Sequence, residues 1–168
     1  MYAKPSPTEE LTQGDIVDGC PFFDTVVRGD SPDARFLAKP MEGRVIVLTQ
    51  ACDLAQEKST RAVVAVMYTA ADLVERKILK AATIRDSVSR NVQLGWYFLE
   101  AAPPEVGLPE SIVDLRDLHT VPRKVLEVLV VQGKRLCRLV TPYREHLAQH
   151  FAITYMRIGL PEPYKTAP

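Results

Sequence analysis

The stretch that most constrains the fold is a short apolar run, Val45-Ile46-Val47-Leu48, which follows Arg44. Three of its four residues are β-branched, and such a run predicts a buried β-strand over residues 44–49. The run ends at polar residues, and Cys52 and Asp53 follow within a few positions. Residues at the end of a strand are held by the sheet yet reach solvent, so we expect a functional site here.

The composition predicts one globular domain over residues 1–168, because 46% of the residues are hydrophobic and 25% are charged. The 21 Lys and Arg residues balance 21 Asp and Glu residues. A protein dedicated to nucleic acid usually carries a basic excess, because neutralised phosphates drive its affinity. The balance therefore argues against a dedicated nucleic-acid binder and leaves a local basic groove open.

Three cysteines, Cys20, Cys52 and Cys137, are too few and too scattered for a disulfide framework. This count predicts a reduced, cytoplasmic protein. The N-terminus has no apolar signal-peptide core, and no apolar stretch approaches the ~20 residues that span a bilayer, so we expect no membrane partner. We also expect no cofactor.

The first half of the chain alternates apolar segments with polar ones. Strands are expected at residues 15–18 and 62–68. The segment 24–42 is rich in glycine, proline and charge, which predicts a long loop; whether it forms a lid is left open. Thr69 predicts an N-cap, and a helix is expected over residues 70–92 with a break near Thr83.

The second half contains further strand and helix signals. Strands are expected at residues 95–99 and 111–115, and a hairpin is expected over residues 125–140 around the turn Gln132-Gly133. A helix is expected over residues 142–158, with Thr141 as its N-cap and Pro142 as its first residue. Several strands with two main helices indicate an α+β domain.

The segments Gly14-Asp15-Ile16-Val17, Pro21-Phe22-Phe23 and Gly43-Arg44, ahead of a strand that ends in Thr49, resemble the start of MazF/PemK-like toxins. The resemblance covers about residues 11–70. It implies an SH3-like or small antiparallel β-barrel there, with the 70–92 helix inserted, additional strands over 95–140 and a C-terminal helix. It also implies cleavage or binding of single-stranded RNA, with Arg44 catalytic and Thr69 assisting.

Arg44 has two interpretations from its position alone. A guanidinium just before a buried strand can hold a phosphate through a bidentate fork and stabilise developing charge. In that role a nearby carboxylate, Asp15 or Asp53, would accept the proton. Alternatively, Arg44 forms an ion pair with Asp53 or Asp18 that only stabilises the fold.

The whole chain also resembles a group of small bacterial proteins without assigned function. These pair a Gln-x-Cys-Asp-Leu strand end, here Gln50 to Leu54, with a C-terminal helix that starts Pro-Tyr-Arg-Glu, here Pro142 to Glu145. This resemblance carries no activity with it. A separate hypothesis is a non-catalytic regulatory subunit of a bacterial toxin-antitoxin or defence system, in which the same barrel acts as the binding module. Such a subunit would bind a partner protein encoded nearby, and a homodimer stays open.

The pair Cys52-Asp53 suggests a third hypothesis, a cysteine- or metal-dependent hydrolase. As a nucleophile, Cys52 would need His146 as its base, with Gln50 as an oxyanion donor. The adjacent carboxylate opposes this, because negative charge disfavours the thiolate. Cys52 would otherwise pack as a small hydrophobe while Asp53 caps a turn.

A metal site is a weaker form of the same hypothesis. His146 and His150 stand four residues apart, so both imidazoles project from one face of the predicted helix. With Cys52 they would make a Cys-His-His set, the kind of ligand set that binds zinc. Helical residues four apart share a face by construction, however, so a partly exposed helix surface is the preferred interpretation of the spacing.

Overall fold

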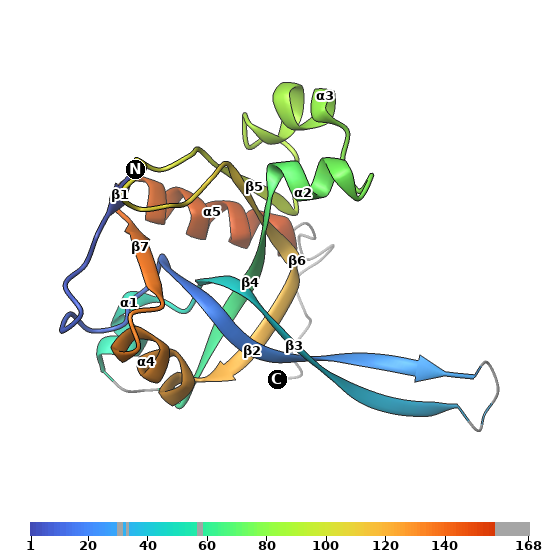
Figure 1. Ribbon diagram of the computed structural model, residues 1–168, viewed down its shortest axis with the longest axis horizontal. Coiled ribbons are helices and arrows are strands. Elements are labelled where there is room, and N and C mark those ends of the chain that lie inside the picture. The colour runs from blue at the N-terminus through green and yellow to red at the C-terminus, as the bar shows by residue number, and fades with distance from the viewer. Residues whose placement is uncertain (30–31, 33, 57–58, 157–168) are drawn as a thin grey trace, which may run out of the picture.

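The computed structural model describes residues 1–29, 32, 34–56 and 59–156. In this part of the chain, antiparallel strands form one sheet in the order β1-β7-β2-β3-β4-β6-β5 (Figure 1). The strands are β1 (Tyr2–Ala3), β2 (Asp15–Arg28), β3 (Arg35–Val47), β4 (Arg61–Thr69), β5 (Trp96–Leu99), β6 (Ser111–Pro122) and β7 (Arg135–Leu139). The helices are α1 (Ala51–Ala55), α2 (Ala70–Glu75), α3 (Ala81–Thr83), the π-helix η1 (Ile84–Val88), α4 (Arg123–Val131) and α5 (Tyr143–Tyr155).

Successive residues of the central strands point to opposite faces of the sheet, and both faces are covered. Val45 and Val47 pack toward α4, together with Leu126. Ile46 lies in the cluster on the other face, together with Leu147 of α5. Figure 1 shows α4 and α5 on opposite sides of the sheet, and we call the two clusters the α4-side core and the α5-side core. Burial on both faces explains why the run at Val45 is continuously apolar.

The α+β class is confirmed by this arrangement. The strand expected at 44–49 is the inner end of β3, and those expected at 62–68, 95–99 and 111–115 match β4, β5 and the start of β6. In the described pairing β1 and β5 lie at the two edges of an open sheet, so barrel closure stays a prediction. Among the described residues, every helix is too short or too polar to cross a membrane.

The loop expected at 24–42 is wrong. Beyond the body of the sheet, β2 and β3 pair only with each other and project as a long two-stranded ribbon, which we call the arm (residues 21–28 and 35–42; Figure 1). Gly29 and Pro32 lie at its turn, whereas Pro40 lies within β3. Proline is tolerated there because an edge strand has no neighbour that needs its missing N–H. The glycine and proline residues that predicted a loop therefore belong to one turn and to one edge strand.

The hairpin expected at 125–140 is also wrong in its first half. Residues Arg123–Val131 form α4, and Leu126, Leu129 and Val130 face the α4-side core at helical spacing. Valine-rich composition favours a strand, but burial of this 3.6-residue stripe decides for the helix. The helix ends at Gly133, which has a φ of 74°. The N–H of Gly133 donates to the carbonyl of Val130, and the N–H of Lys134 donates to the carbonyl of Leu129, which is a Schellman motif.

The single helix expected at 70–92 is divided into α2, α3 and η1. The chain leaves α2 at Arg76, and Lys77 takes a positive φ of 57°. The helix passes from α to π geometry after Thr83, where a break was expected. At the C-terminal helix the N-cap is Pro142 rather than Thr141, and the expected end at 157–158 lies outside the described residues.

Candidate functional site

Arg44 is engaged in an ion pair within the sheet. Its Nη2 lies 3.3 Å from Oδ2 of Asp18, and its Nε lies 3.4 Å from Oδ1. Asp18 sits in the irregular stretch of β2 between Val17 and Cys20, where the register with β3 shifts. The structure thus shows the Asp18 pairing, one of the two alternatives for Arg44. Its catalytic role stays a prediction.

Thr69 is the N-cap of α2, as expected. Its Oγ1 accepts a hydrogen bond from the backbone N–H of Asp72 at 3.0 Å. Arg44 pairs with Met67 across β3 and β4, so Thr69 stands two residues further along the same face. The described pairing of β3 with β4 ends at Arg44 and Met67, and Arg44 and Thr69 each have another partner, Asp18 and the N–H of Asp72.

Cys52 lies exposed on α1, with polar neighbours from its own segment. Its thiol donates to Oε1 of Gln50 at 3.6 Å and to Oδ1 of Asp53 at 3.8 Å. Both contacts are with acceptors, so neither stabilises a thiolate. Leu54 anchors α1 in the α4-side core.

His146 lies on the other side of the sheet from Cys52. Its Nδ1 is 2.9 Å from the hydroxyl of Tyr97, a residue of the α5-side core. The structure therefore does not bring together the thiol and imidazole that nucleophilic catalysis would need.

His146 and His150 pack against Tyr97, each with ring centroids 5.5 Å from it. His150 is buried. Its burial, and to a smaller extent the neighbouring His146, lowers the pKa of its imidazole. Its Nε2 has no hydrogen-bond partner among the described residues. Within that part of the chain, no group of three His, Cys, Asp or Glu side chains is placed to hold a metal ion.

Basic residues of β7 serve a buried ion network around Asp15. The fully buried carboxylate of Asp15 accepts from Nε of Arg138 at 2.6 Å and from Nη1 of Arg135 at 3.1 Å. The same guanidinium groups donate to the backbone carbonyls of Glu9 and Glu10. These arginines therefore tie the N-terminal segment to the sheet.

The two faces of the arm differ sharply in chemistry. Cross-strand partners share a face, and successive pairs alternate between faces. One face carries the pairs Phe23–Pro40, Thr25–Ala38 and Val27–Phe36, all exposed and all uncharged, with Pro21–Glu42 at its base. The other face carries charged pairs, Asp24–Lys39 and Arg28–Arg35, between apolar ones. We call the uncharged side the apolar face of the arm.

A cleft lies between the base of the arm and α2, with a volume of about 380 Å³. In it Asp117 accepts from the Tyr68 hydroxyl at 3.0 Å and lies 2.9 Å from Nε2 of His119. The ring of Phe22 stacks on His119 at 4.3 Å. Burial, and to a smaller extent the hydrogen bond to Asp117, raises the pKa of Tyr68 to about 12, so the phenol stays protonated and acts as a donor. This cluster braces the arm against the body.

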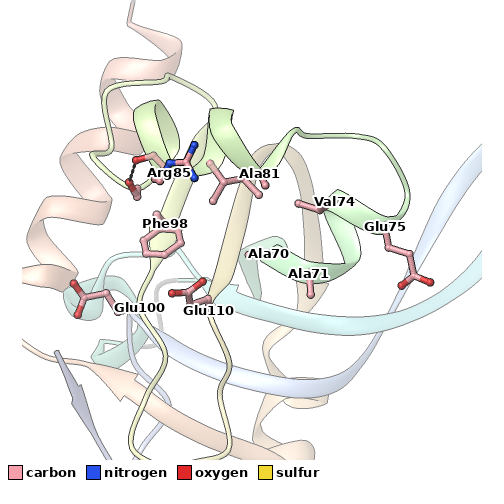
Figure 2. A pocket seen from close by; sticks show the side chains of 11 residues that line it. Ala70, Ala71, Val74, Glu75, Ala81, Arg85, Phe98, Glu100 and Glu110 are labelled. Carbon is pink, nitrogen blue, oxygen red and sulfur yellow. Dashed lines mark hydrogen bonds between the residues drawn. The ribbon is translucent and has the colours of Figure 1, made fainter.

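A larger pocket of about 1050 Å³ opens beside α2, η1 and the β5–β6 connection (Figure 2). Its wall is mostly apolar, with Ala70, Val74, Ile84 and Phe98. Three carboxylate residues also line it: Glu75, Glu100 and Glu110. Sequence reasoning missed this pocket and the apolar face, because both depend on strand register and on the break after α2.

A scan of protein-family descriptions finds no match to this chain, and a search of curated proteins finds none either.

Proposed function

We propose that this protein is a non-catalytic interaction module that binds a partner protein through the apolar face of its arm. The observation that carries the proposal is the row of exposed, uncharged side chains along that face. Phe23 is 67% exposed and Phe36 73% exposed. The one charged residue on this side of the described arm is Glu42, which pairs with Pro21 at the base of the row.

Energetics favour a covered arm. An isolated two-stranded ribbon is marginally stable in water, because it has no third strand or helix on which to bury a face. Burying one Phe or Val side chain contributes about 1.5–3 kcal/mol, so covering Phe23, Val27 and Phe36 provides several kcal/mol toward association. A row of this kind on a projecting element is typical of a protein-interaction site.

The chemistry of the face favours a protein over RNA. Affinity for nucleic acid comes chiefly from cations that neutralise phosphates, and the three cross-strand pairs of the apolar face carry none. The centre of a protein interface is instead depleted of charge and enriched in aromatic residues. A partner protein that presents an uncharged apolar surface therefore fits this face.

RNA cleavage has weaker support from the geometry. Arg44 is paired with Asp18 and Thr69 caps α2, so both residues have structural tasks. The SH3-like barrel, the MazF/PemK-like activity and the thiol- or metal-dependent hydrolase stay predictions.

Site-directed photocrosslinking in cells tests the proposal. A benzophenone side chain replaces Phe36 on the apolar face, and in a matched control it replaces Val131, an exposed residue of α4 (81%). We expect one discrete protein adduct from position 36, absent from position 131 and abolished by Val27→Asp. Adducts with RNA, or with a second copy of this chain alone, would contradict the proposal, as would equal adducts from both positions.

A further inference from the structure

The pocket beside α2 is separate from the arm and has its own chemistry. We infer that it binds a small organic cation, an ammonium or guanidinium group carried on an apolar body. The inference is independent of the partner protein proposed for the arm.

The first observation is a pair of like charges at the mouth of the pocket. β5 and β6 pair Leu99 with Ser111, and the backbone bond from Ala102 to Leu108 (2.8 Å) continues the same register. Glu100 therefore stands opposite Glu110. Like charges directly across an antiparallel pair are destabilising, and a bound cation between them would relieve the repulsion.

The pocket keeps an excess of negative charge. Glu75 adds a third carboxylate to the lining. Among the described residues, these three glutamates form no ion pair. The lining cation Arg85 pairs with Asp86 at 3.3 Å. A positive ligand is thus favoured over a neutral or negative one.

The second observation is an aromatic ring beside the carboxylates. Phe98 lies in β5 and Glu100 directly follows that strand, and the side chains of Phe98, Glu100 and Glu110 all line the pocket (Figure 2). The face of an aromatic ring attracts ammonium and guanidinium groups through its quadrupole. A ring with two carboxylates therefore forms a site for the charged end of the ligand.

The third observation is the apolar wall that continues from this site. Ala70, Ala71, Val74 and Ile84 line the rest of the cavity. Small-molecule sites are mostly apolar, with a few convergent polar groups, and occupy ~300–1,000 Å³. The volume of about 1050 Å³ matches the upper end of that range and accommodates an aliphatic or aromatic body.

The test is binding of n-hexylammonium to the full chain, followed by NMR titration, with 1-hexanol and hexanoate as neutral and negative counterparts of the same length. We expect hexylammonium to bind about fivefold or more tightly than hexanol, with shifts at Phe98 and Ala71. The double variant E100Q/E110Q should reduce its affinity to that of hexanol. The matched control Glu105→Gln removes an exposed carboxylate of the same connection that does not line the pocket, and it should change nothing.

Equal binding of hexylammonium and hexanol, tighter binding of hexanoate, or an equal loss in Glu105→Gln would overturn the inference. Binding of a lysine-containing peptide without binding of the free amine would also overturn the inference, because the pocket would then recognise a side chain of a partner protein and not a small organic cation. None of these outcomes bears on photocrosslinking at the arm, so the two proposals fail separately.

Discussion

Val27 and Phe36 face each other across the arm, and both side chains project into solvent, 55% and 73% exposed. Neither contributes to the cores of the body. Because both side chains are exposed, burial in the folded monomer does not explain why two large apolar residues stand side by side on a projecting ribbon. Their exposure supports the proposal that the arm binds a partner.

The first prediction separates this role from folding. Phe36→Ser should change the free energy of unfolding by less than about 0.5 kcal/mol, because the side chain is already exposed. Ile46→Ala, at a fully buried position of the same strand, should cost about 2–5 kcal/mol. Urea unfolding measures both. A loss of stability in Phe36→Ser as large as in Ile46→Ala would show that the arm serves folding.

The second prediction concerns the buried carboxylate of Asp15. Asp15→Asn should destabilise the protein by about 3–5 kcal/mol, since the buried Arg135 would lose its anion and Arg138 would keep only the half-exposed Glu9. Glu9→Gln is the control, because Glu9 pairs with the same Arg138 but is half exposed, and it should cost less than about 1 kcal/mol. Similar losses in the two variants, measured by urea unfolding, would contradict a buried network.

The third prediction distinguishes capping from catalysis at Thr69. Thr69→Ala should lower the free energy of unfolding by about 0.5–2 kcal/mol, because the N–H of Asp72 loses its acceptor. Thr69→Asp should restore stability, since a carboxylate accepts the same bond and suits the N-terminus of a helix. Thermal unfolding tests this pair. If Thr69→Asp is as unstable as Thr69→Ala, the hydroxyl has a task other than capping.

The fourth prediction is a pH dependence that arises from His150. Burial lowers the pKa of its imidazole in the folded state, so below pH ~6.5 the unfolded chain binds the proton more readily. His150 therefore contributes its full stability above that pH and loses it as the pH falls toward the lowered pKa, by at most about 1.4 kcal/mol per pH unit. The variant His150→Gln should show a shallower decline between pH 7 and pH 5. Parallel curves for the variant and the wild type would contradict the assignment.

Local signals predicted the elements that depend on neighbouring residues alone. The apolar run at Val45 predicted the inner end of β3, and Thr69 predicted the start of α2. Valine-rich α4 was mistaken for a strand because β-branched residues favour strands unless a helical stripe is buried, and only the sheet beneath it decides that.

The candidate sites depend on long-range pairing, which local signals do not contain. The apolar face exists because β2 and β3 pair in the register that sets Val27 against Phe36. The carboxylate pair of the pocket arises because Glu100 directly follows β5 and Glu110 directly precedes β6, at the end of the pairing between the two strands. A one-residue shift in register would distribute the same side chains over both faces.

The most direct test of the account is thiol labelling of the arm in cells, in a Cys52→Ser background. Cys52 is the exposed cysteine, and burial raises the pKa of Cys20 to about 11 and that of Cys137 to about 12, so both stay unreactive. One variant carries Ala38→Cys on the apolar face, and the matched variant carries Lys39→Cys on the other face.

If a partner at ten times its Kd covers the face, position 38 should label about tenfold more slowly in cells than in purified protein, while position 39 labels at the same rate in both. Equal labelling of position 38 in cells and in purified protein would contradict a partner-covered arm.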